Sequence, residues 1–182
     1  MSYRQFGNSG FMVSEMVFGT TPWDNDHFLN IIAAGREKGI NYIDTAPAYS
    51  KGQSEKIIGK YFKQSGNRDD MFLSTKISFY DEYMNRLSNG IYKDLSAEKQ
   101  EALSKKADKM MEEREIMKPG YHFKYFGGQD KKFKAIYLRY LVFKEYGSLK
   151  KWKSDIQARM HELVDNSLQA LNTDYLDVLH CP

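Results

Sequence analysis

Four ionisable side chains lie at the ends of extended segments or a few residues after them: Asp44, Tyr49, Lys76 and His180. A lysine held by a carboxylate is a fixed positive centre, and a phenol beside an ammonium is a stronger acid than a free phenol. Tyr49 could therefore donate a proton to a developing alkoxide, while His180 hydrogen-bonds the same oxygen. This set suits carbonyl reduction, in which hydride reaches carbon as a proton reaches oxygen.

Short strands alternating with amphipathic helices carry these residues. Turn residues between two extended runs predict a hairpin over 3–15. Apolar runs predict strands over 16–20, 42–44, 71–76 and 175–179, and apolar residues at helical spacing predict helices over 28–38 and 158–171. Ser54 is predicted as the N-cap of a further helix that reaches Phe62. This alternation favours a parallel sheet.

Two architectures fit this order of elements, the doubly wound sheet and the (β/α)₈ barrel. The dinucleotide-binding pattern Gly-x-Gly-x-x-Gly follows none of the predicted strands, which favours the barrel. Catalytic residues of a parallel barrel lie at the carboxyl ends of its strands. Asp44, Lys76 and His180 would meet there with Thr20 and Thr21.

Each of these residues also has an ordinary structural interpretation. Asp44 could cap a loop, His180 could be a hydrogen-bonded core histidine, and Tyr49 is one of 13 tyrosines. Their joint placement at strand ends is what favours the catalytic interpretation.

Composition narrows the class of protein. The chain has 182 residues, of which 41% are hydrophobic and 14% aromatic, so we expect a folded chain with a core. Its one cysteine, Cys181, cannot form an internal disulfide, and we expect no metal centre. The sequence contains no run of about 18 apolar residues and no apolar signal sequence at its start. We therefore expect a cytoplasmic protein without a membrane span.

The net charge of +3 hides an uneven distribution. Residues 118–153 hold ten lysines or arginines against Asp130 and Glu145, together with ten aromatic residues. Such a segment could stack bases and neutralise phosphates. The segment also contains the apolar residues Ile136, Leu138, Leu141 and Val142. They favour instead a packed accessory element whose basic side chains point outward.

Five segments together resemble the aldo-keto reductase family. The most specific are GINYIDTAPAY over 39–49 and SEKIIG over 54–59. The others are YRQFGNSG over 3–10, FLSTK over 72–76 and LNTDYLDVLHCP over 171–182. The resemblance covers about residues 1–77 and 157–182, and it implies an N-terminal hairpin that closes the bottom of a barrel.

The resemblance also implies an activity and a site. It places the catalytic tetrad on Asp44, Tyr49, Lys76 and His180, with Tyr49 as the proton donor. It implies reduction of aldehydes or ketones with NADP(H), less often NAD(H), and without a metal. Gly19, Thr20, Thr21 and Asp44 match the cofactor side of the site. Many members carry tryptophan where Thr21 stands, whereas here Trp23 follows two residues later.

Two features depart from the family pattern. Lys76 and His180 are 104 positions apart, so we predict a mainly helical insertion over 78–156, between the third strand and the third helix. Within this insertion we expect a long charged helix over 96–115 and a second helix that contains the apolar residues of 136–143. Its basic and aromatic part is predicted to lie over or beside the barrel mouth as a lid.

The second departure is that only the first four βα units are recognisable before Pro182. We expect the front part of a longer reductase. The alternative is an inactive half-barrel that binds a partner, such as a second copy, across the edges of its first and fourth strands. Nucleic acid is the less favoured partner for that alternative.

Overall fold

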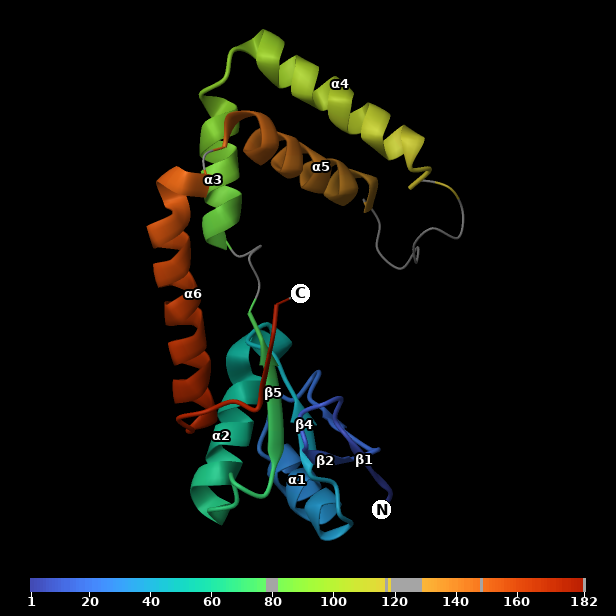
Figure 1. The fold of residues 1–182 in the computed structure, drawn as a ribbon, viewed down its shortest axis with the longest axis vertical. Helices are drawn as coiled ribbons and strands as arrows, with labels where there is room; N and C mark the ends of the chain where they lie inside the picture. The colour runs from blue at the N-terminus through green and yellow to red at the C-terminus, as the bar shows by residue number, and fades with distance from the viewer. Residues whose placement is uncertain (78–81, 117, 119–128, 148, 182) are drawn as a thin grey trace. The chain divides into compact units, whose positions relative to one another are not determined.

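The computed structural model describes residues 1–77, 82–116, 118, 129–147 and 149–181. The chain divides into two compact units (Figure 1). One unit comprises Met1–Phe79 with Asp155–Pro182, and the other comprises Tyr80–Ser154. Every candidate site residue belongs to the first unit.

A parallel sheet of four strands forms the centre of the first unit. Its strands, in the order in which they neighbour one another, are β3 (Phe18–Gly19), β4 (Tyr42–Asp44), β5 (Phe72–Lys76) and β6 (Val178–His180). An antiparallel hairpin of β1 (Tyr3–Gln5) and β2 (Met12–Ser14) precedes it. The first four units of a (β/α)₈ barrel with an N-terminal hairpin, predicted from the sequence, are therefore confirmed.

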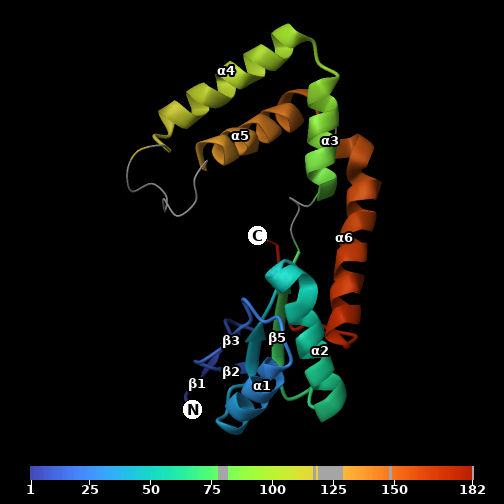
Figure 2. The same ribbon diagram turned by 180° about the vertical axis from the view of Figure 1, so that it is seen from behind.

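Helices cover one face of this sheet (Figure 2). They are α1 (His27–Glu37), α2 (Gln53–Ser65) and the C-terminal part of α6 (Leu149–Leu171). Ile43 and Leu73 of the strands are fully buried against Ile32 and Ile58 of the helices. Alternate strand residues point to opposite faces, so this packing directs Asp44, Ser74 and Lys76 to the other face.

The helices α2 and α6 approach closely at Gly59. A Cβ atom at this position would lie 2.1 Å from the carbonyl oxygen of Ala170, which no side chain tolerates. Glycine is therefore required here by contact with backbone, since its own φ is not in the left-handed region.

The hairpin closes the amino-terminal end of the sheet with aromatic side chains. The ring centroids of Phe6 and Phe11 lie 4.9 and 5.1 Å from that of Phe72, and Phe6 also contacts Tyr42 edge-on. Tyr42 and Phe72 are the first residues of β4 and β5. The carboxyl ends of the strands, where the candidate site lies, are at the opposite end.

Arg68 holds β6 against β5. Its guanidinium donates to Asp177 Oδ2 at 2.9 Å, to the carbonyl oxygens of Met71 and Tyr175 at 2.6 and 3.1 Å, and to a threonine hydroxyl. Asp177 Oδ2 also accepts the backbone N–H of Leu73 at 2.8 Å. This network sets the register in which Lys76 pairs with His180.

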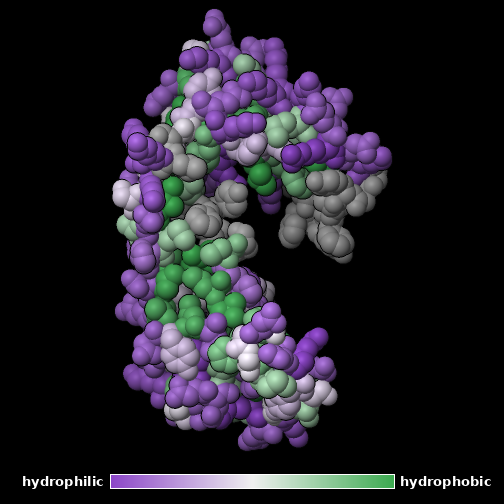
Figure 3. All heavy atoms as spheres, viewed as in Figure 1, coloured by the Kyte–Doolittle hydropathy of each residue, from purple (hydrophilic) through white to green (hydrophobic). Residues whose placement is uncertain are grey.

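The second unit is helical, with α3 (Glu82–Lys93), α4 (Ala97–Glu113) and α5 (Gln129–Tyr146). Its core consists of Leu103 and Ala107 from α4 and Leu141 and Val142 from α5. Figure 3 shows hydrophilic side chains over the outer side of α4 and hydrophobic ones between α4 and α5. The two long helices were predicted, whereas α3 was not.

One part of the predicted apolar face in this unit is wrong. Ile136 is 48% exposed, although Leu141 and Val142 are buried as expected. The lid predicted for 118–153 stays a prediction, and its aromatic run over 121–126 lies outside the described residues.

Several predicted element boundaries are corrected by the structure. Met16 and Val17 are exposed and precede β3, and β6 begins at Val178 instead of Tyr175. The helix predicted from Ala158 begins at Leu149, within the insertion predicted over 78–156. Trp152, whose ring contacts Phe143, gives the first turns of this helix an apolar anchor that its neighbouring lysines conceal in the sequence.

Ser54 does not cap α2. The N-cap is Gly52, and Ser54 lies inside the helix, where its buried hydroxyl lies within hydrogen-bonding distance of two loop carbonyls. Within the ranges that the structure describes, no helix is both long and apolar enough to cross a membrane.

Candidate active site

Parallel register brings the predicted site residues to one edge of the sheet. Asp44 is the last residue of β4 and lies beside Gly19 on one side and Ser74 on the other. Lys76 ends β5 and lies beside His180, which ends β6. Four strands thus deliver their polar residues to their common carboxyl ends.

Lys76 is the centre of this group. Its Nζ donates to Asp44 Oδ2 at 2.7 Å and to the carbonyl oxygen of Thr45 at 2.8 Å. The same Nζ lies 4.8 Å from the centroid of the Tyr49 ring. Burial by itself lowers the pKa of Lys76, but hydrogen bonds to Asp44 and Tyr49 outweigh burial and raise the pKa above its usual value. The ammonium is therefore charged at neutral pH.

The second carboxylate oxygen of Asp44 is held by residues that sequence reasoning missed. Ser74 donates its hydroxyl to Asp44 Oδ1 at 2.7 Å, and Tyr42 donates its own to Ser74 Oγ at 3.1 Å. Both lie two residues before a predicted site residue on the same strand. The two-residue period of a strand, which places them on the same face as Asp44 and Lys76, is the signal that could have found them.

Tyr49 and His180 differ in how they are held. Tyr49 is half-buried and begins the 3₁₀ turn η1 (Tyr49–Gly52), and its ring contacts Lys76. His180 is exposed, and its position comes from the pairing of β6 with Lys76 on β5. The structure thus brings Asp44, Tyr49 and Lys76 into contact and places His180 at the same edge.

Three of the four residues predicted on the cofactor side, Gly19, Thr20 and Thr21, have different surroundings. Thr20 is fully buried and donates its hydroxyl to the backbone oxygen of Asp44 at 3.0 Å, so that hydroxyl braces β3 against β4. Thr21 is exposed, and open space surrounds the position of a Cβ on Gly19. Trp23 is buried and stacks on Phe28.

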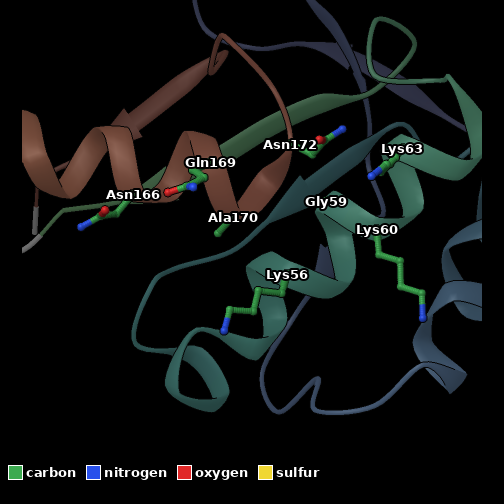
Figure 4. Close-up of a pocket in the computed structure, with 8 residues that line it drawn as sticks. All are labelled: Lys56, Gly59, Lys60, Lys63, Asn166, Gln169, Ala170 and Asn172. Carbon is green, nitrogen blue, oxygen red and sulfur yellow. The ribbon is translucent and has the colours of Figure 1, made fainter.

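A groove of about 570 Å³ lies elsewhere on the same unit, between α2 and the end of α6 (Figure 4). Its lining consists of lysines, amides and two small residues: Lys56, Gly59, Lys60, Lys63, Asn166, Gln169, Ala170 and Asn172. None of the candidate site residues lines it. Among the described residues, no cluster of histidine, cysteine, aspartate and glutamate could hold a metal ion.

Comparison with known proteins agrees with this arrangement. The family model described as "Aldo/keto reductase family" matches residues 15–117, more than half of the chain. The aldo-keto reductase YhdN of Bacillus subtilis is 40% identical over an 84-residue alignment that covers 42% of this chain and 25% of that protein. A probable voltage-gated potassium channel subunit beta of Arabidopsis thaliana is 34% identical over 83 residues, with the same coverage. The matched region therefore spans about a quarter of these relatives.

A shorter relative is covered almost fully. An uncharacterised 11.2 kDa protein of Pseudescherichia vulneris is 34% identical over an 89-residue alignment that covers 42% of this chain and 86% of that protein. Among solved structures, the holo form of an aldo-keto reductase from Bacillus halodurans superposes with a TM-score of 0.54 at 24% identity, over all of this chain and 40% of that one. The chain belongs to the aldo/keto reductase family.

Proposed function

We propose that the site reduces an aldehyde or ketone to an alcohol, with NADP(H) as the hydride donor and Tyr49 as the proton donor. The observation that carries the proposal is the position of the Lys76 ammonium, between the Asp44 carboxylate and the Tyr49 ring. A charged ammonium at this distance stabilises the phenolate that remains after Tyr49 gives up its proton.

Each neighbouring residue has a role in this proposal. Asp44 fixes the ammonium, and Ser74 fixes the carboxylate through its second oxygen. His180, exposed beside Lys76, would hydrogen-bond the carbonyl oxygen of the substrate and orient it toward Tyr49. The side chains of Lys76 and Asp44 are 25% and 30% exposed, so a small carbonyl compound can reach them.

The described residues fit the nicotinamide end of the cofactor. Gly19, at the carboxyl end of β3, faces open space, Thr21 is exposed two residues later, and Asp44 is partly exposed beside Gly19. These three residues would hold that end, whereas the Thr20 hydroxyl already donates to the carbonyl oxygen of Asp44. When bound, the cofactor supplies the hydride, and NAD(H) is the second candidate for that position. The compartment we propose is the cytoplasm.

Two measurements on the chain test this function. Fluorescence titration with NADPH, paired with light scattering for mass, measures cofactor binding and the species that binds. Tyr49→Phe should lower the rate of aldehyde reduction by about 10² to 10⁴-fold, since it removes a general acid. The affinity for the cofactor should be unchanged. The matched control is Tyr3→Phe, because Tyr3 is an exposed tyrosine of the same unit. Turnover retained by Tyr49→Phe would refute the assigned proton donor.

A further inference from the structure

The turn that carries Tyr49 has an unusual backbone. After Tyr49, three consecutive residues lie in the left-handed region: Ser50 at φ 48° and ψ 36°, Lys51 at φ 55° and ψ 42°, and Gly52 at φ 84°. Glycine adopts this region without strain, but each of the other two residues is disfavoured there by roughly tenfold in population. Such a conformation persists only where surrounding contacts hold both ends of the segment.

Backbone hydrogen bonds hold the first end of the turn. The N–H of Tyr49 donates to the carbonyl oxygen of Ala46 at 3.0 Å, and the N–H of Lys51 donates to that of Ala48 at 3.4 Å. Ala46 is buried two residues after the end of β4, so this end of the turn lies close to the strand that carries Asp44. At the other end, the backbone N–H of Gln53, the first residue of α2, donates to the carbonyl oxygen of Ser50.

Ser54, in the first turn of α2, supplies one contact at the second end. It is fully buried, and its hydroxyl lies 2.8 Å from the carbonyl oxygen of Thr20 and 3.0 Å from that of Trp23. The single hydroxyl proton is shared between these two acceptors. The start of α2 is therefore fixed to the loop that follows β3.

Glu55 supplies a second contact. Its side chain is 3% exposed, and its Oε1 accepts the hydroxyl of Thr75 at 2.7 Å. Thr75 directly precedes Lys76 on β5. The first turn of α2 is therefore tied to the strand that carries the ammonium as well as to the loop that follows β3.

We propose that Ser54 and Glu55 are positioning residues that hold the left-handed Tyr49–Gly52 turn and thereby keep the Tyr49 ring against the Lys76 ammonium. The importance of that contact for catalysis rests on the function proposed above, but the positioning itself rests on geometry alone. Without these buried hydrogen bonds the turn would relax out of the left-handed region, and Tyr49, which begins it, would move from Lys76.

The contact can be observed without turnover, by NMR of the full chain. Because Lys76 Nζ lies over the Tyr49 ring, the ring current should shift the ε-methylene signals of Lys76 upfield from those of exposed lysines. Tyr49→Leu defines the value without the ring. Ser54→Ala and Thr75→Val should each lose most of this upfield shift. Glu55→Gln should keep it, because the amide oxygen can still accept the Thr75 hydroxyl.

The matched control is Ser14→Ala. Ser14 is a buried serine of the same unit, 1% exposed, whose hydroxyl donates to the carbonyl oxygen of Met16. This change should weaken the fold to a similar degree without altering the shift of Lys76. A shift retained in both Ser54→Ala and Thr75→Val, or lost equally in Ser14→Ala, would overturn the inference.

Glycine substitutions test the strain directly. The double substitution Ser50→Gly and Lys51→Gly should restore the upfield shift in the Ser54→Ala background. Glycine adopts the left-handed region without strain, so the turn should then keep its conformation without the Ser54 hydrogen bonds. In the wild-type background the same pair should keep the shift and lower the unfolding equilibrium constant about fivefold or more. The measurement in the wild-type background tests whether the turn is strained even if Ser54→Ala fails to fold. Failure to restore the shift, or a raised unfolding constant, would show that the turn is not strained.

The outcome is separable from that of the proposed function. Turnover retained by Tyr49→Phe would refute the proton donor and leave this inference intact. An unchanged Lys76 shift in the variants would refute the inference and leave the proton donor intact.

Discussion

Arg68 is the residue whose loss should affect the candidate site most from a distance. Its side chain and that of Asp177 are each only 11% exposed, and Arg68 Nη2 lies 2.9 Å from Asp177 Oδ2. Three further acceptors depend on the guanidinium, and its Cζ lies 3.8 Å from the centroid of the Tyr175 ring. The change to make is Arg68→Met, which keeps a long apolar side chain and removes every donor.

The expected loss is set by the carboxylate that remains. Removing one partner of a buried ion pair costs about 3 to 5 kcal/mol, because the other charge is left without compensation. The Leu73 N–H, which stays bonded to Asp177, offsets part of this cost. We expect a loss of about 3 kcal/mol in the free energy of opening, which corresponds to a factor of roughly 150.

Amide hydrogen exchange measures this loss at the place where it matters. The Ile77 N–H donates to the carbonyl oxygen of His180 at 2.9 Å, so it reports the β5–β6 pairing that aligns His180 with Lys76. Its exchange should accelerate roughly 150-fold in Arg68→Met. Arg68→Lys, which keeps one charge without the planar fork, should lie between this variant and wild type.

A double substitution separates the charge from the packing. Asp177→Asn added to Arg68→Met removes the unpaired charge and keeps an acceptor for the Leu73 N–H, so it should recover much of the lost protection. Exchange at Ile77 that changes less than about fivefold in Arg68→Met would refute the reasoning, since that is an effect of only about 1 kcal/mol.

Three further predictions concern the same unit. Gly59→Ala should lower the free energy of unfolding by about 2 kcal/mol or more, measured by urea denaturation, because its Cβ would meet the Ala170 carbonyl at 2.1 Å; an unchanged midpoint would contradict the close packing. The stability contributed by Lys76 should be complete below pH 10.5 and fall as pH rises through its raised folded-state pKa, with a smaller fall in Asp44→Asn. Burial raises the pKa of Glu55 above 4.5, despite hydrogen bonds that lower it. Stability should therefore fall as pH rises from 4.5 through that raised pKa, and Glu55→Gln should remove this fall in pH-dependent thermal unfolding.

The strands and the long helices were predictable because their apolar residues recur with the period of the element. Ile43 and Leu73 are buried where the pattern placed them, and Asp44 and Lys76 follow at the strand ends. α3 was missed although Met84, Leu87 and Ile91 recur there at helical spacing. Asn89 and Gly90, which have low helix propensity, interrupt that pattern. The residues that hold the site were missed for another reason. Ser74 donates to a carboxylate 30 positions away, a partner that no local pattern reveals.

The case of Ser54 shows the same limit. A serine before an apolar helical pattern predicts an N-cap, since its hydroxyl can accept a local N–H. Here the hydroxyl donates instead to carbonyls 34 and 31 positions earlier in the chain, and glycine in the left-handed region begins the helix. Buried long-range acceptors outweigh the local preference.

The sequence by itself determined the fold family, the order of the strands and the chemistry available at their ends, because residue type and period are local properties of the chain. Only the tertiary structure decided that Lys76 lies between Asp44 and Tyr49 and that the Thr20 hydroxyl donates to the carbonyl oxygen of Asp44. It also decided that Tyr49 begins a turn with a left-handed backbone. Those facts depend on hydrogen bonds between residues about 20 to 35 positions apart, and such bonds exist only once the sheet and its helices have packed.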